Sequence, residues 1–232
     1  MLFFALLAMA ACRTPQDIAY LQDVKEYEEI PTPHDGYIRF KKGDKMQINV
    51  HSRDEKMREL FNIKSTNSAG GTQNGQSYTV GADGTIDFPV LGKITVEGLT
   101  REEVGASIKG MLVNTDLCRD AIVNVTFTDM TFSVLGNAGT GVKQITKDRI
   151  TIMEALAMGD LNIDGLRKNI LVMRQEGDKQ VAYRVDVTQA KSVYSSPVYY
   201  IQQNDVIYVE PNDKFKRNST VMGSTAFTPT FW

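Results

Sequence analysis

The chain has 232 residues, 42% hydrophobic and 23% charged, which is the composition of a globular protein with one large or two small domains. Its formal net charge of -2 and the lack of a basic stripe argue against nucleic-acid binding. Two cysteines, Cys12 and Cys118, and two distant histidines, His34 and His51, predict neither a metal site nor a cysteine nucleophile.

The first twelve residues, MLFFALLAMAAC, are predicted to be a lipoprotein signal peptide. Residues 2–11 form an apolar run too short to span a bilayer, and small residues precede Cys12 as they precede a signal cleavage site. The end of this run, MAAC, resembles a bacterial lipobox, in which the cysteine receives the lipid, although no Lys or Arg precedes the run. A buried helix with an incidental cysteine is the alternative. Residues 13–36, which are polar and contain prolines, are expected to be a tether.

The first predicted domain, residues 37–129, begins with a strand and a short helix. Met46, Ile48 and Val50 alternate with polar residues, so one face of the strand is expected to be buried. A helix follows over residues 54–61, with its apolar side chains turned inward. Two residues are candidates for its N-cap, Ser52 and Asp54.

Residues 64–77 contain almost nothing to bury, which predicts a mobile surface loop, either a variable insertion or a binding loop. The next stretch, residues 78–112, organises the domain. Its Asp83-Gly84 pair lies between β-prone runs and favours a tight hairpin turn, because the pair supplies positions with positive φ. Alternating apolar residues predict two strands, around residues 85–88 and 94–96.

A helix is predicted to follow over residues 100–114. Thr100 and Glu103 have the spacing of a capping box, in which each side chain accepts a hydrogen bond from the backbone of the other residue. Residues 121–127 alternate as a closing strand, and strands on both sides of one helix make the domain α+β.

The second predicted domain, residues 130–211, has the pattern of a β-grasp arrangement. Strands are expected near residues 132–136 and 142–145, and a helix over 151–158 ends before Gly159. Glu176-Gly177-Asp178 is then predicted to turn a hairpin of two further strands. The last strands are expected at 198–201 and 206–209.

A tail is predicted over residues 212–232. Its last part is uncharged, and Phe227, Phe231 and Trp232 suit either a membrane interface or a disordered terminus.

Residues 78–100 follow the pattern Y-x-V-x-x-D-G-x-I-x-x-P-x-L-G-x-I-x-V-x-G-L-T, which resembles the core of the polysaccharide export domain of bacterial outer-membrane (Wza-like) exporters. VLG-x-A-x-x-G from Val134, ITI-x-EAL from Ile150 and QNDVIYVEP from Gln203 are similar to the soluble-ligand-binding β-grasp (SLBB) domain that follows it in this family. The resemblance covers roughly residues 37–211 and implies an α+β fold of two small domains.

The resemblance implies a subunit of an export conduit for capsular or exopolysaccharide, without enzymatic activity and without a cofactor. Such a protein is held by its lipid, here on Cys12, at the periplasmic face of the outer membrane and assembles with its own copies into a ring. Its partner would be an inner-membrane polysaccharide co-polymerase, often a tyrosine autokinase. Arg13, where some lipoproteins retained in the inner membrane have Asp, favours the outer membrane by the same analogy.

Two other functions remain open from the residues. A sugar-binding periplasmic adaptor without a pore would need a binding surface, for which Tyr194, Tyr199 and Tyr200 are the candidates. Tyrosines in such a group either stack on sugar rings or pack against the sheet. An enzyme acting on polysaccharide would need two converging carboxylates, and no pair in the sequence stands out as catalytic.

Overall fold

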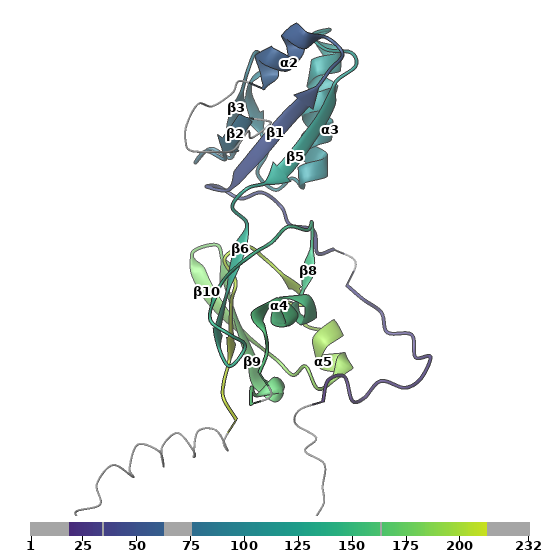
Figure 1. Cartoon of the computed structure of the whole chain (residues 1–232), viewed down its shortest axis with the longest axis vertical. Coiled ribbons are helices and arrows are strands. Elements are labelled where there is room, and N and C mark those ends of the chain that lie inside the picture. The colour runs from purple at the N-terminus through teal and green to yellow at the C-terminus, as the bar shows by residue number, and fades with distance from the viewer. Residues whose placement is uncertain (1–18, 34, 63–75, 163, 213–232) are drawn as a thin grey trace, which may run out of the picture. The chain divides into compact units, whose positions relative to one another are not determined.

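The structure of the protein is a computed structural model that describes residues 19–33, 35–62, 76–162 and 164–212 (Figure 1). The described residues form two compact units. We call the first unit Gly36–Thr131 together with Gln144–Arg149, and the second unit the remainder. The expected lipid attachment residue, Cys12, lies outside the described residues, as do nearly all of the predicted surface loop and of the tail.

The sheet of the first unit has three antiparallel strands in the order β2-β1-β5. The alternation predicted for the central strand is confirmed, because Met46, Ile48 and Val50 are all fully buried. Figure 1 shows helix α3 lying along this sheet beside β1 and β5. The strands are β1 (Lys45–His51), β2 (Gln76–Thr79) and β5 (Ile122–Phe127).

Both predicted helices of the first unit are present. Helix α2 (Glu55–Phe61) is capped by Asp54, whose carboxylate accepts from the N–H of Lys56 at 2.9 Å. Helix α3 (Arg101–Asn114) starts with the predicted capping box: Thr100 Oγ1 accepts from Glu103 N, and Glu103 Oε2 accepts from Thr100 N at 2.8 Å. The hydrogen bond from the Thr100 N–H lowers the pKa of the Glu103 carboxyl.

The Asp83-Gly84 pair forms a turn but not the expected hairpin. The N–H of Gly84 donates to the carbonyl of Gly81 at 3.0 Å, as in a tight turn. The strand after the turn, β3 (Thr85–Phe88), pairs with β4 (Gly92–Thr95), whereas β2 before the turn pairs with β1. The turn therefore joins two sheets, and the hairpin prediction was wrong because turn chemistry alone does not select the pairing partner.

The second unit is built on a five-stranded mixed sheet in the order β10-β9-β12-β6-β7. A parallel pair, β12/β6, is flanked by β9 and β10 on one side and by β7 on the other. The hairpin turn at Gly177 is confirmed, since β9 and β10 pair from Glu176 and Lys179 onward. The strands are β6 (Thr131–Gly136), β7 (Gly141–Gln144), β9 (Ile170–Glu176), β10 (Lys179–Val185) and β12 (Val206–Val209).

Helix α4 (Ile152–Gly159) follows the short strand β8 (Ile150–Thr151). Thr151 and Glu154 form a second capping box, and Asp160, rather than the expected glycine, takes the left-handed position that ends the helix. Gly159 is instead the last helical residue. The predicted strand at 198–201 is confirmed only in part, since β11 (Tyr200–Ile201) pairs with β8 in a separate two-stranded sheet.

The N-terminal segment, residues 19–33, forms no helix or strand and bends at turns over residues 22–23 and 26–27. Leu21 N donates to Val187 O at 3.2 Å, and Gln22 N donates to Thr188 O at 2.7 Å. The expected tether is therefore hydrogen-bonded to the second unit at Leu21 and Gln22. It lies near helix α5 (Ala190–Tyr194), which forms part of the candidate site described next.

Candidate functional site

The three tyrosines singled out from the sequence form one cluster. The ring centroids of Tyr194 and Tyr199 are 5.2 Å apart, and those of Tyr199 and Tyr200 are 4.7 Å apart with their planes at 74°. Tyr199 is only 9% exposed, so its ring belongs to the core of the unit. Tyr194 and Tyr200 are half-buried and flank it.

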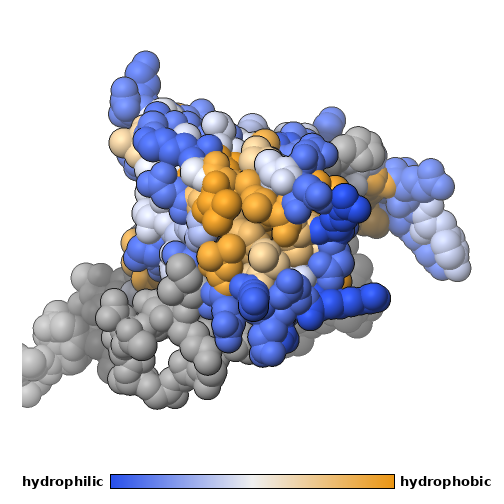
Figure 2. Space-filling view, turned by 90° about the horizontal axis from the view of Figure 1, so that it is seen from above, coloured by the Kyte–Doolittle hydropathy of each residue, from blue (hydrophilic) through white to orange (hydrophobic). Residues whose placement is uncertain are grey.

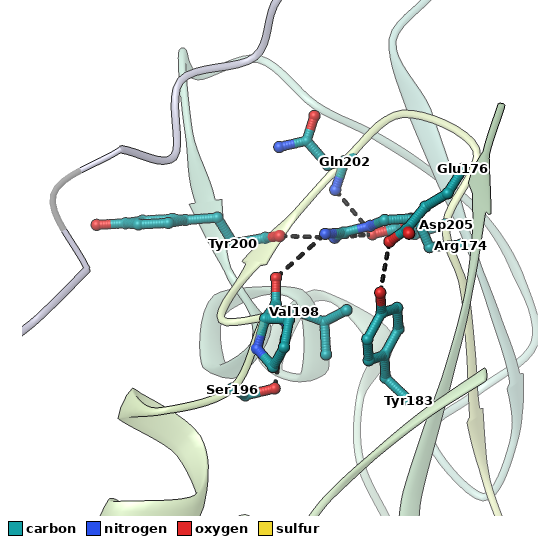
Figure 3. A network of polar contacts seen from close by, with 9 residues as sticks. Arg174, Glu176, Tyr183, Ser196, Val198, Tyr200, Gln202 and Asp205 are labelled. Atoms are coloured by element: carbon teal, nitrogen blue, oxygen red, sulfur yellow. Dashed lines mark hydrogen bonds and ion pairs between the residues drawn. The ribbon is translucent and has the colours of Figure 1, made fainter. Parts of the chain in front are cut away.

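Tyr200 is positioned by a buried ion pair (Figure 3). Arg174 on β9 donates from Nη2 to the Tyr200 carbonyl at 2.8 Å and binds Asp205 through two nitrogens, at 3.0 and 2.6 Å. Asp205 also accepts from the N–H of Gln202 at 2.8 Å, which closes the turn between β11 and β12. The backbone of Tyr200 is therefore fixed by charge-assisted hydrogen bonds, and its side chain leaves that point toward the N-terminal segment.

A pocket of about 480 Å³ lies beside this cluster. One wall is helix α5, which includes Tyr194, together with the next residue, Ser195. The opposite wall is the N-terminal segment. The described lining residues are Asp23, Glu28, Glu29, Ile30, Pro31, Ala190, Lys191, Tyr194 and Ser195.

Asp23 joins the two walls. Its carboxylate accepts hydrogen bonds from the backbone N–H groups of Ala190 and Lys191, the latter at 3.2 Å, at the start of helix α5. The Ala190 N–H holds the pKa of Asp23 below its ordinary value, because a hydrogen bond to the ionised form favours that form. Outside the described pocket lining, Tyr200 Oη donates to the carbonyl of Pro33 at 3.2 Å, which is a second contact to the N-terminal segment.

The pocket lining combines a tyrosine, the apolar residues Ile30 and Pro31, and charged residues that can form hydrogen bonds. Within the described ranges, no group of three or more His, Cys, Asp or Glu side chains is arranged to hold a metal ion. Cys118 is buried, with its thiol 3.5 Å from Asp120 Oδ1, which fits the structural role expected of it.

A second hollow, about 530 Å³, runs along the first unit between helix α3 and strand β5. On the helix side the groove is lined by the small residues Gly105 and Ala106, and on the strand side by Asn124 and Thr126. Of the strands that the structure describes, none pairs with the outer edge of β5, because the sheet order is β2-β1-β5. Such an edge can accept an extended segment of another chain.

The end of the first unit that carries α2 presents an apolar patch rimmed by hydrophilic residues (Figure 2). Exposed apolar side chains from three elements lie at this end: Leu60 in α2, Ile122 at the start of β5, and Val90 in the turn after β3. Val90 has a φ of 67°, a left-handed conformation that a β-branched residue rarely adopts. Rimmed apolar patches of this kind mark interaction surfaces.

The sequence pointed to Tyr194, Tyr199 and Tyr200 but not to their partners. Asp23, Glu28 and Glu29 belong to a charged, proline-containing segment, with no periodicity to show that they face the second unit. The one usable signal was Asp205, which precedes an alternating strand just as Asp44 does. Both aspartates are buried, and each accepts from the N–H three residues earlier, Lys41 and Gln202, at 2.8 Å.

Residues 32–128 match the family described as polysaccharide biosynthesis/export protein, which covers nearly all of the first unit. This is a family of transport proteins and not of enzymes, as the sequence predicted. Among the described residues, no helix has both the length and the apolar character needed to cross a membrane.

Proposed function

We propose, from the polysaccharide biosynthesis/export domain that residues 32–128 form, that this protein is a subunit of a conduit that exports capsular or exopolysaccharide. The family match is the observation that carries the proposal. Cys12 would carry a lipid and hold the chain at the periplasmic face of the outer membrane. Replacement of Cys12 by serine should then leave the protein in the soluble fraction of the cell envelope, whereas the native chain should partition with the outer membrane.

Self-assembly into a ring is supported by the surfaces of the first unit. Head-to-tail contact of two different surfaces generates rings when the rotation closes. The open edge of β5 with its groove, and the apolar patch at the α2 end, are two such surfaces. Ile122 lines the groove and is 59% exposed, so its side chain is available for such a contact.

The test is the mass of the detergent-extracted, lipid-bearing protein by native mass spectrometry or light scattering. A closed multimer is expected for the native chain, and Ile122→Glu should shift it toward the monomer, because a charge at this position would be desolvated in the contact. Met158→Glu, which places the same charge on an exposed residue of helix α4, should leave the mass unchanged. A strict monomer at high concentration would exclude the self-assembled conduit.

A glycan-binding adaptor without a pore is the second candidate function. The pocket beside Tyr194 favours it, since that pocket has the groups that recognise sugars. In either function the inner-membrane partner would be a polysaccharide co-polymerase, often a tyrosine autokinase. Co-purification of that protein with the native chain, in cells that still make the glycan, tests the partnership.

A further inference from the structure

The pocket of the second unit is made by two segments that are more than a hundred and fifty residues apart, as the sequence separation of 167 between Asp23 and Ala190 shows. Five of its described lining residues belong to the N-terminal segment, and the other four belong to helix α5 and Ser195. Removal of the N-terminal segment would therefore leave α5 and Tyr194 facing open solvent. The pocket exists only while the segment is docked.

Docking depends on a small number of contacts near the two ends of the described segment. Near its start, Leu21 and Gln22 donate to backbone carbonyls, Asp23 accepts at α5, and the Tyr20 ring lies 5.0 Å from the Arg167 guanidinium. Near its end stands the bond from Tyr200 to Pro33. Most side chains between these contacts are exposed, including Val24, Lys25 and Tyr27. A segment held in this way can detach without unfolding the sheet, because few buried apolar contacts oppose its release.

We propose that the N-terminal segment is a movable wall of a saccharide pocket, so that docking of the segment and binding of glycan reinforce each other. A ligand that touches both walls binds only the docked state and must stabilise it, and its apparent affinity falls in proportion to the fraction of molecules in which the segment is docked. This inference rests on the proposed contact with glycan, but it requires neither the ring nor the lipid. If Cys12 is lipidated, the same segment also connects the pocket to the anchor.

The charges of the pocket define which saccharides it accepts. Three of the described lining side chains, Asp23, Glu28 and Glu29, are carboxylates, and Lys191 is the one cation among them. Asp23 is engaged with helix α5, and Glu28 accepts from the Lys25 N–H at 2.9 Å. The net charge of these four lining side chains is negative, so a neutral or amino-bearing sugar fits, and a uronate or sulfated sugar is repelled.

Hydrogen–deuterium exchange of the full chain, read by mass spectrometry, first tests the docking of the N-terminal segment without ligand. Asp23→Ala should speed exchange several-fold in peptides covering residues 188–194, because the Ala190 and Lys191 amides lose the carboxylate that accepts from them. Exchange should also speed up in peptides covering residues 20–24, because the segment is then held by fewer contacts. Tyr200→Phe should loosen the region around Pro33 without touching Asp23. Glu26→Ala is the matched control, an exposed acidic residue of the same segment outside the described pocket lining, and should change neither region.

The second step adds an oligosaccharide of neutral or amino-bearing sugars, with a uronate-rich oligosaccharide of similar length as comparison. The neutral or amino-bearing probe should slow exchange of both walls in the native chain and bind Asp23→Ala several-fold more weakly. Protection of α5 alone, or equal binding by Asp23→Ala, would overturn the coupling. No protection by any probe would overturn the saccharide pocket while leaving the export function to be judged by polysaccharide surface display in cells.

Discussion

Arg174 and Asp205 form a two-pronged ion pair inside the second unit, with side chains that are 12% and 1% exposed. Arg174 lies on β9 and Asp205 immediately precedes β12, so the pair ties a central strand to the turn that follows β11. The same guanidinium donates to the carbonyls of Pro197 and Tyr200 (Figure 3). One buried pair thus holds the chain that presents the tyrosine cluster.

Removal of one member of this pair should strongly destabilise the second unit. Asp205→Ala leaves a buried guanidinium without its carboxylate, and such a loss costs about 3–5 kcal/mol. We expect a large shift of the midpoint in denaturant-induced unfolding. Asp129→Ala is the control, because its pair with Lys45 is more than half exposed and such pairs contribute about 0–1 kcal/mol. Similar shifts for both variants would contradict the proposed stabilisation of the second unit by the Arg174–Asp205 pair.

A glycine in the turn after β6 should tolerate no side chain. Gly139 has a φ of 76°, and a Cβ there would lie far inside van der Waals contact with the carbonyl oxygen of Gly159, the last residue of α4. Gly139→Ala should therefore destabilise the second unit by about 1–3 kcal/mol, measured by thermal unfolding. Gly110→Ala, on a helix position of α3 with open space around it, should instead stabilise the first unit by about 0.5–1 kcal/mol. Equal tolerance at both positions would contradict the close approach of the turn to α4.

The capping box at Thr100 should contribute measurably to the unfolding free energy of the first unit. Thr100→Ala removes the acceptor for the Glu103 N–H, and loss of an N-cap side chain costs about 0.5–2 kcal/mol. Ser107→Ala, in the interior of the same helix, should be neutral or slightly stabilising, because alanine has the higher helix propensity. The comparison uses the unfolding free energy of the two variants, and a larger loss for Ser107→Ala would contradict the cap.

Local chemistry was predicted well from the sequence because short-range hydrogen bonds decide it. The cap of α2, the capping box of α3 and the hairpin at Gly177 all depend on residues within a few positions of one another. Strand pairing was predicted less well. The Asp83-Gly84 turn is present, but the strand before it, β2, pairs with the distant strand β1, and the strand after it, β3, pairs with β4. Packing between elements, such as the stacking of Phe88 on Tyr78 and Phe61, selects these partners, and turn chemistry does not encode it.

Half of the candidate site could be predicted, and the other half could not. Tyr194, Tyr199 and Tyr200 are close together in the chain, so their clustering follows from sequence proximity. Asp23 meets Ala190 across a separation of 167 residues, and nothing in a polar, proline-containing segment indicates a docking partner. The acidic wall of the pocket therefore became visible only in three dimensions.

The ionised form of Asp23 should make docking of the N-terminal segment depend on pH. Because the Ala190 N–H lowers the pKa of Asp23 in the docked state below its ordinary value of 3.8, the docked state binds the proton less readily than the released state. The stabilisation is therefore fully present above pH 3.8, and it is lost as the pH falls through the lowered pKa. Protonation at low pH should release the segment from α5.

The measurement is the backbone amide NMR shift of Ala190 and Leu21 between neutral pH and the acid limit of folding. A transition with a midpoint below 3.8 is expected at both amides in the native chain, and Asp23→Asn should abolish it. Glu28, Glu29 and Lys191 line the same pocket, so Glu28→Gln serves as the control that retains the transition. A midpoint at or above 3.8, or an unchanged transition in Asp23→Asn, would show that another group controls the segment.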